Sequence, residues 1–197
     1  MSPTTRRLAA PFAAFVVGLV ALGAAAYTAL APAPRTAAGS SIGGPFRLVS
    51  GDGGTVTDRD FRGAPFLVFF GFTHCPDICP TKLFELSEVF RDLGDKAPRV
   101  KALFVTVDPE RDTPDAMKTY VASFGDRIVG LTGDRAEVDA MVKSYRAFAK
   151  KVPLADGDYT MEHTALVYLM DKEGRFVGSF DLSRGPAKAA QELLRQS

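Results

Sequence analysis

An uninterrupted apolar run that leads straight to a pair of cysteines is the feature that most constrains how this chain can fold. The run extends from Ala64 to Phe72 and is rich in Phe and Val. Such a run is typical of a parallel strand that is covered on both faces. Just beyond it lie Cys75 and Cys79, the only two cysteines of the chain, followed by apolar residues at helical spacing. The cysteines are therefore predicted to lie where a buried strand meets a helix.

The rest of the chain continues this alternation of strand and helix patterns. Further strands are predicted from Val100 to Val107, from Ile128 to Leu131, and as a hairpin, Thr164 to Met170 and Arg175 to Phe180, about the turn at residues 171–174. Helices are predicted after Pro80, from Thr113-Pro114, from Asp134 to Phe148 and from Gly185-Pro186. This order indicates a mixed sheet flanked by helices. With a cysteine pair at the first strand-to-helix junction, the predicted architecture is α/β and thioredoxin-like.

The N-terminal part of the chain has a different character. Arg6 and Arg7 precede Leu8 to Leu30, 23 residues without a charge, which exceeds the ~20 apolar residues that span a bilayer. We predict one transmembrane helix within residues 1–30, with its N-terminus in the cytoplasm; a cleaved signal peptide is the alternative. Residues 31–44 are predicted to be a Pro/Ala/Gly-rich linker, and residues 45–197 a single domain. The composition of the anchor and linker favours a bacterial inner membrane, with the domain in the periplasm.

The charge of the domain argues against one class of partner. The first 40 residues contain three of the 24 basic side chains and none of the 23 acidic ones, so the remainder carries a formal charge near −2. A domain of that charge has no electrostatic attraction for nucleic acid. No nucleic-acid partner is therefore expected.

Two thiols four residues apart can be inert core side chains, close a disulfide or chelate a soft metal. A helix N-terminus presents free N–H groups and partial positive charge, so we expect the pKa of these cysteines to be lowered. Residues i and i+4 share a helix face, so both sulfurs can reach one ion. The prolines Pro76 and Pro80 make inert packing the weaker interpretation, and a bridge over so short a loop stabilises little.

The spacing and a histidine shift the balance toward a metal. Thioredoxin redox pairs are C-x-x-C, one residue narrower than the spacing here, although a disulfide is still compatible with it. Thiolates with an imidazole select Cu(I), zinc or iron–sulfur centres, and a closed zinc site takes four protein ligands. His163, which follows a Gly- and Asp-containing loop, is the predicted third ligand; the alternative is an ordinary hydrogen-bonded histidine. His74 is predicted to point away from Cys75 and not to bind metal.

Three separated motifs give the sequence a family resemblance. Residues 71–80 (Gly-Phe-Thr-His-Cys-Pro-Asp-Ile-Cys-Pro), 107–114 (Val-Asp-Pro-Glu-Arg-Asp-Thr-Pro) and 162–164 (Glu-His-Thr) resemble, in that order, the Sco/SenC family of copper chaperones. The resemblance extends from about Gly44 to Leu194. It implies a thioredoxin-like domain that binds copper, Cu(I) and also Cu(II), through Cys75, Cys79 and His163. Glu162 stands where the family usually has Asp. The longer Glu side chain is predicted to alter a contact around the site but not the metal ligands.

The resemblance also implies a role and partners. Such proteins are implicated in assembling the binuclear copper centre of cytochrome c oxidase, so its copper-binding subunit and other copper chaperones are the expected partners. The alternative is a thiol–disulfide oxidoreductase that reduces the recipient's cysteines, with Cys75 attacking and Cys79 resolving. Peroxidase chemistry is disfavoured because the peroxiredoxin signature places Thr three residues before its cysteine, whereas Thr73 is two before Cys75. Asp108 and Arg111 form either a partner surface or a salt-bridged turn.

Overall fold

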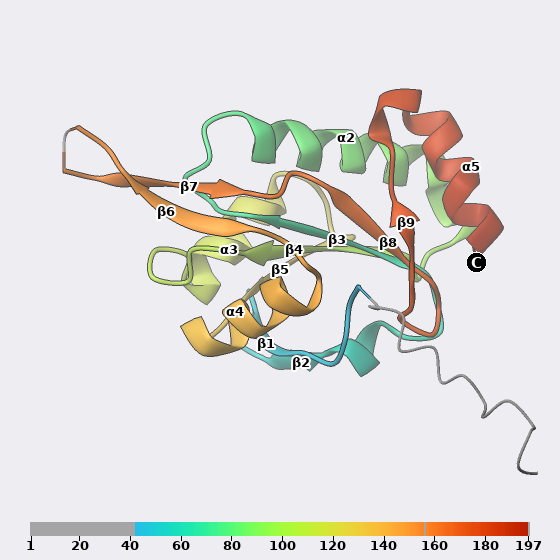
Figure 1. Cartoon of the computed structure of the whole chain (residues 1–197). Helices are drawn as coiled ribbons and strands as arrows, with labels where there is room; N and C mark the ends of the chain where they lie inside the picture. Colours follow the sequence, from blue (N-terminus) through green and yellow to red (C-terminus); the bar gives the residue numbers. More distant parts are fainter. Residues whose placement is uncertain (1–41, 156, 197) are drawn as a thin grey trace, which may run out of the picture. The chain divides into compact units, whose positions relative to one another are not determined.

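A seven-stranded mixed sheet of order β2-β1-β5-β4-β3-β8-β9 forms the centre of the fold (Figure 1). The computed structural model describes residues 42–155 and 157–196. The strands are β1 Arg47–Ser50, β2 Thr55–Thr57, β3 Phe66–Gly71, β4 Lys101–Thr106, β5 Ile128–Thr132, β6 Ala149–Pro153, β7 Tyr159–His163, β8 Val167–Met170 and β9 Phe176–Ser179. The α-helices are α2 Ile78–Leu93, α3 Pro114–Ala122, α4 Arg135–Ser144 and α5 Pro186–Gln196. The short 3-10 helices are Asp58–Phe61, Gly94–Lys96 and Leu182–Arg184.

The predicted anchor and linker lie almost wholly outside the described residues. The chain divides into two units, residues Met1–Gly39 and Ser40–Ser197, and the structure describes only the second. Among the residues it describes, no helix has both the length and the apolar character needed to cross a membrane.

The apolar run of the sequence becomes the central strand. All six residues of β3 are buried, and the strand pairs in parallel with β4 and antiparallel with β8. A strand with neighbours on both sides and layers on both faces requires apolar side chains at every position, which explains the absence of alternation. The α/β thioredoxin-like fold with a mixed sheet is confirmed.

Successive residues of β3 project to opposite faces of the sheet. Phe70 contacts the ring of Tyr145, next to the end of α4, and that of Tyr168 in β8, at centroid separations of 5.5 and 5.9 Å. Phe69 projects to the other face, where its centroid lies 5.9 Å from that of Phe104 and 6.3 Å from that of His163. Helices α2 and α5 lie together on one side of the sheet and α4 on the other (Figure 1).

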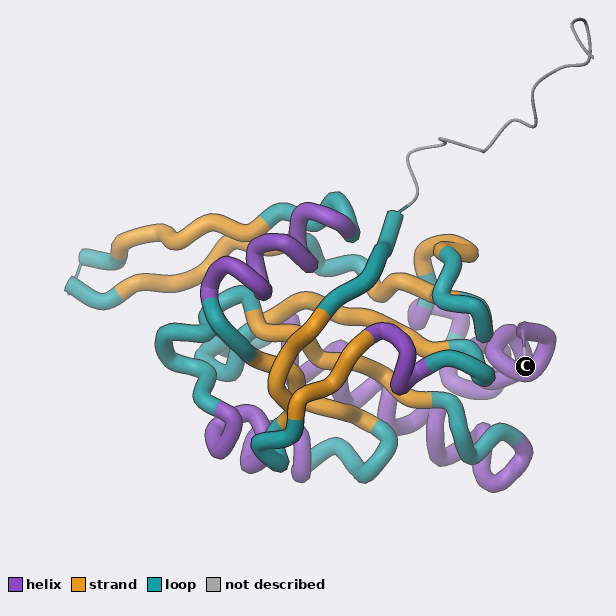
Figure 2. The backbone as a smooth tube through the Cα atoms, turned by 90° about the horizontal axis from the view of Figure 1, so that it is seen from below, coloured by secondary structure: helices purple, strands orange, loops and turns teal. Residues whose placement is uncertain are grey.

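A two-stranded arm stands apart from the main sheet. Strands β6 and β7 pair antiparallel with each other only, in a register that sets Ala149 opposite His163 and Pro153 opposite Tyr159. In two views at right angles the arm projects beyond the body of the domain (Figures 1 and 2). The sequence did not predict this arm, and the predicted helix from Asp134 to Phe148 was too long. Helix α4 ends at Ser144, and Phe148 is 53% exposed in the segment before β6.

The predicted strand after His163 was also misplaced at its start. His163 ends β7 rather than opening the next strand, and β8 begins only at Val167. Two other expectations are confirmed. Thr113 caps α3 by accepting a hydrogen bond from the Ala116 N–H, and the turn after Asp171 joins β8 to β9.

Candidate metal centre

The two cysteines lie at the junction of β3 and α2, as predicted. β3 ends at Gly71, and the Cys75 N–H closes a turn by donating to the Phe72 carbonyl at 3.2 Å. Helix α2 begins at Ile78, so Cys79 is in its first turn. The Cys79 N–H has no partner within the helix and donates to the Cys75 Sγ at 3.4 Å. The helix start therefore holds the Cys75 sulfur beside Cys79.

Gly71 provides the space for the Cys79 sulfur. Cys79 is fully buried. A Cβ atom on Gly71 would lie 2.8 Å from the Cys79 Sγ and 2.5 Å from the Phe104 ring, closer than real contacts allow. Any larger residue here would displace either the sulfur or the ring beneath it. The sequence gives no direct sign of this role, because a glycine at the end of a strand is common for other reasons.

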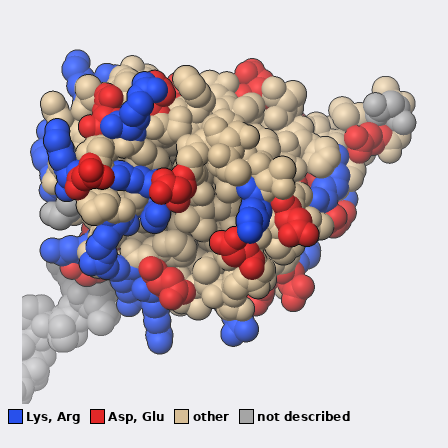
Figure 3. Space-filling view, turned by 180° about the vertical axis from the view of Figure 1, so that it is seen from behind, with Lys and Arg blue, Asp and Glu red and all other residues tan. Residues whose placement is uncertain are grey.

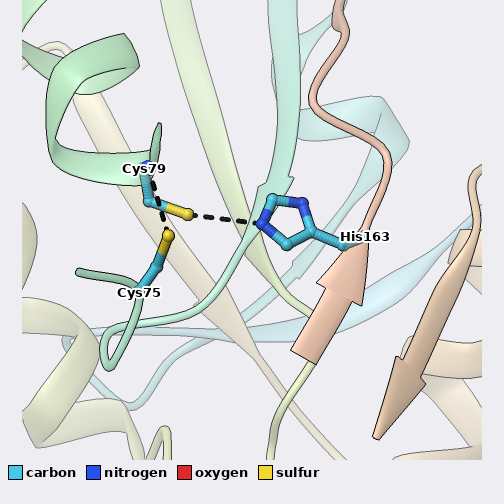
Figure 4. Close-up of side chains that lie close together, drawn as sticks. All are labelled: Cys75, Cys79 and His163. Carbon is cyan, nitrogen blue, oxygen red and sulfur yellow. Dashed lines mark hydrogen bonds between the residues drawn. The ribbon is translucent and has the colours of Figure 1, made fainter. Parts of the chain in front are cut away.

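His163 reaches the cysteines from the base of the arm (Figure 4). Its Nε2 lies 3.6 Å from the Cys79 Sγ, and its Nδ1 lies 3.1 Å from the Thr164 carbonyl oxygen. A carbonyl can only accept, so Nδ1 carries the proton and the Nε2 lone pair faces the sulfur. The rings of Phe69 and Phe72 pack against the imidazole in T-shaped arrangements, with centroid separations of 6.3 and 5.7 Å. These contacts fix both the orientation of the ring and its tautomer.

Burial controls the protonation of two of these groups. It raises the pKa of the Cys79 thiol well above its usual value, and the neighbouring Cys75 side chain raises it further. The expectation of a lowered thiol pKa is therefore wrong for Cys79, because burial of the sulfur disfavours its charged form. Burial lowers the pKa of His163, although its bond to Thr164 acts in the opposite direction. Near neutral pH, Cys79 is thus a thiol and His163 a neutral imidazole.

Cys75, Cys79 and His163 form a compact set of donors. Their ligand atoms all lie within 4.8 Å of one another, and within the described residues this is the one cluster of three such side chains suited to a metal ion. Both cysteines are free thiols. In a zinc site, bonds to sulfur and imidazole nitrogen measure ~2.3 and ~2.0 Å, so two such donors on one ion stand no more than ~4.3 Å apart. The observed 3.6 Å between the Cys79 Sγ and the His163 Nε2 fits that limit.

His74 and Glu162, which directly precede Cys75 and His163 in the sequence, lie outside the cluster. The His74 side chain is 56% exposed, and its Nδ1 lies 3.1 Å from the Thr73 hydroxyl and 4.0 Å from the Asp112 carboxylate. Glu162 is exposed and, as the neighbour of His163 in a strand, projects from the opposite face of β7. The Nδ1 of His163 is bonded to the Thr164 carbonyl and not to Glu162.

A buried carboxylate that the sequence did not single out holds the loop before Cys75. Asp112 is fully buried and accepts from the Thr73 N–H at 3.1 Å, the Thr73 hydroxyl at 2.6 Å and the Thr106 hydroxyl at 2.6 Å. It therefore ties the cysteine loop to the end of β4. No pattern distinguishes Asp112 from the other acids of its motif, because its role depends on contacts across 39 residues of sequence.

The motif from Val107 to Pro114 also contains a salt-bridged turn. The Arg111 Nε donates to the Asp108 carboxylate at 2.5 Å, and the Asp108 side chain is fully buried. The salt-bridged turn, one of the two interpretations of these residues, is therefore present. The guanidinium also reaches the arm, where its Nη1 donates to the Tyr159 carbonyl at 3.1 Å.

Comparison with known proteins identifies the family. Residues 34–196 match the SCO1/SenC family. The chain belongs to the SCO1/SenC family. It is 41% identical to the mitochondrial SCO1 homolog of Mus musculus over 155 residues, 77% of this chain and 55% of that protein. The SCO2-like protein RP587 of Rickettsia prowazekii is 35% identical over 78% of this chain and 76% of its own length. The chain thus spans about half the length of the first mitochondrial relatives it matches.

Solved structures of SCO1/SenC proteins have the same fold. The structure of Bradyrhizobium japonicum ScoI with copper bound is 57% identical and superposes with a TM-score of 0.77, covering 80% of this chain and all of that one. Yeast Sco1 with copper bound is 34% identical with a TM-score of 0.72, covering 79% of this chain and 87% of that one.

Proposed function

We propose that this SCO1/SenC protein binds copper through Cys75, Cys79 and His163, and delivers it to, or prepares, the binuclear copper centre of cytochrome c oxidase. The observation that carries the proposal is the meeting of two thiols and an Nε2 lone pair within 4.8 Å of one another. Soft sulfur donors with one imidazole suit copper. Support comes from the copper-bound structures of ScoI and yeast Sco1, which share the fold. The oxidase as destination rests on the family resemblance.

The arrangement suits a metal that must leave again. Three donors leave room for an incoming ligand, and His163 is only half-buried while Asp77 and Ile78 beside the cysteines are exposed. A thiolate or imidazole of the recipient can therefore replace these donors one at a time. Copper is the cargo in this scheme, and the protein supplies neutral imidazole and, after loss of their protons, two thiolates.

A second function, thiol–disulfide reduction, is favoured by the unequal burial of the two thiols. Cys75 is 9% exposed and Cys79 is fully buried with a raised pKa, so Cys75 is the better placed nucleophile. Cys75 would attack a disulfide of the recipient, and Cys79 would then displace the recipient's sulfur. One disulfide forms here as one is reduced there, with two electrons passing to the recipient. Since oxidised sulfurs cannot bind metal, the two functions exclude each other at any moment.

The wider organisation is proposed from the sequence. Residues 1–30 would form a membrane anchor and residues 31–44 a linker, with the domain of residues 45–197 held in the periplasm at a bacterial inner membrane. The copper-binding oxidase subunit and other copper chaperones would then meet the site from the same compartment.

The test of copper binding is the stoichiometry and affinity of the reduced full chain for Cu(I), measured by competition with a chromophoric chelator. Cys75→Ser, Cys79→Ser and His163→Ala should each weaken binding, and His74→Ala should not. Unchanged affinity in all three ligand variants would contradict the proposed site. Reductase activity toward a model disulfide separates the second function, because it should survive His163→Ala and be lost in Cys75→Ser.

A further inference from the structure

The position of His163 depends on an arm that has no strand pairing with the main sheet. Strands β6 and β7 form a sheet of their own, and His163 is the last residue of β7. Cys75 and Cys79, by contrast, are held by β3 and α2 in the body of the domain. The distance between the imidazole and the sulfurs therefore depends on the short link from His163 to β8, on the rings beside the imidazole, and on the side-chain contacts that seat the arm against the body.

Those contacts converge on Tyr159 at the start of β7. The Arg111 guanidinium carbon lies 3.8 Å from the centre of the Tyr159 ring, and the Lys151 Nζ lies 3.9 Å from it. The Tyr159 hydroxyl donates to the Asp108 carboxylate at 3.0 Å, which also accepts from the Arg111 Nε. Lys151 in turn pairs with Glu110 at 2.6 Å. We call this set, Asp108, Glu110, Arg111, Lys151 and Tyr159, the clasp.

Arg111 links the body of the domain to the arm at several points. Its Nε pairs with buried Asp108, its Nη1 donates to the Tyr159 carbonyl at 3.1 Å and to Asp158 at 3.3 Å, and its plane covers the Tyr159 ring. A planar guanidinium can stack and form several hydrogen bonds at once, whereas a lysine ammonium cannot. Contacts of this cation–π kind contribute more when the cation is partly removed from water, and the Arg111 side chain is 18% exposed.

Strand geometry transmits this contact to the metal centre. Residues 159, 161 and 163 line one face of β7, because successive side chains of a strand alternate. Tyr159 is held by the clasp, Met161 is buried, and His163 faces Cys79. Four residues of strand span ~13 Å, too short and stiff a connection for His163 to move independently of Tyr159. A rotation or slip of β7 would direct the imidazole away from the sulfurs.

We propose that Arg111 is a positioning residue of the metal centre, which holds the arm through Tyr159 so that His163 faces Cys75 and Cys79. This inference rests on the proposed copper site. Without Arg111, buried Asp108 loses its counter-charge, and Tyr159 loses both the cation over its ring and the donor to its carbonyl, so His163 spends less time at the cysteines. Residues that orient a metal ligand typically change metal affinity 10- to 100-fold when removed. The affinity for Cu(I) should accordingly fall about tenfold or more in Arg111→Ala.

A double-mutant cycle on the reduced full chain tests the inference. Cu(I) affinity is measured for the parent, Arg111→Ala, His163→Ala and the double variant by competition with a chelator. If Arg111 acts through His163, its removal weakens binding in the parent but has no further effect when His163 is already alanine. Arg175→Ala is the matched control, since its side chain is 73% exposed and pairs only within the β8–β9 turn; it should leave the affinity unchanged.

The other possible outcomes of the double-mutant cycle distinguish the role of Arg111 from the copper site itself. An equal loss in both backgrounds, or no loss in the parent, overturns the role of Arg111 while leaving the copper site intact. No loss in His163→Ala alone would instead overturn the proposed ligand set. Hydrogen exchange of the metal-free protein gives a second readout: Arg111→Ala should speed exchange of the amides of β6 and β7 and leave those of β3 unchanged. If Arg111→Ala does not fold, Arg111→Lys and Tyr159→Phe apply the same cycle, each with a smaller expected loss.

Discussion

At the scale of single residues, the environment of Cys79 has a consequence for copper binding. Its sulfur lies in the core beside Gly71 and Phe104, and burial raises the pKa of its thiol. A metal binds the thiolate, so each copper ion bound near neutral pH must displace the Cys79 proton. His163 releases none, since its lowered pKa keeps it neutral there.

This predicts that copper affinity increases with pH. For each proton displaced, the apparent affinity for Cu(I) should rise about tenfold per pH unit while the thiol remains protonated. Titration of the reduced protein in weak buffer measures the protons released for each ion bound. Cys79→Ser should release one fewer than the parent. Equal release from the two proteins would show that copper displaces no proton from Cys79, because Cys79 either is already a thiolate or does not bind the ion.

At the scale of elements, the sequence predicted the strands and helices that are marked by continuous apolar runs or by capping residues. β3 and β4 are recognisable because a strand buried on both faces contains few polar residues, and α3 because Thr113 and Pro114 start it. The arm was missed because Lys150 and Lys151 make β6 resemble a loop, and because Phe148 continued the apolar spacing of α4 past its end. The three ligands could be predicted from cysteine spacing and a family motif. The clasp could not, because it depends on contacts between distant elements.

Asp112 offers a prediction at this same scale, because it joins the cysteine loop to β4. Its carboxylate is fully buried and receives three hydrogen bonds from Thr73 and Thr106. In Asp112→Ala these donors lose their partner, and an unsatisfied buried donor costs about 1–3 kcal/mol. The free energy of unfolding in urea should therefore fall by about 2 kcal/mol or more.

The matched control for Asp112 is Asp139→Ala on α4. The Asp139 side chain is 60% exposed, with only a distant pairing to Arg135, so its loss should change stability by less than about 0.5 kcal/mol. Equal unfolding midpoints for the two variants would show that the bonds to Asp112 contribute nothing net to the fold. Such a result would also remove the reason to regard this carboxylate as the support of the cysteine loop.

At the scale of the whole molecule, we expect the domain to fold without the metal. The core extends from β1 to α5 and includes the fully buried β3 and most of β4, whereas the three ligands occupy one end of a single strand-to-helix junction and the base of the arm. On the face seen in Figure 3, acidic and basic side chains are interspersed around a largely uncharged area. A domain with its own core should stay folded when copper is removed, unlike small domains that fold only around a metal.

Copper should nevertheless stabilise the reduced protein by mass action. At free Cu(I) 100 times its dissociation constant, binding to the folded state alone adds about 2.7 kcal/mol, which for a chain of this size raises the melting temperature by about 5–10 °C. Calorimetry of the full chain, with free copper set by a chelator, measures the shift. Excess chelator should return the lower melting temperature without loss of secondary structure. The Cys75→Ser/Cys79→Ser variant and the oxidised protein should show no shift, because neither offers thiolates. An equal shift in that variant would place the bound copper away from the cysteines, and both the proposed function and the role of Arg111 would then fail.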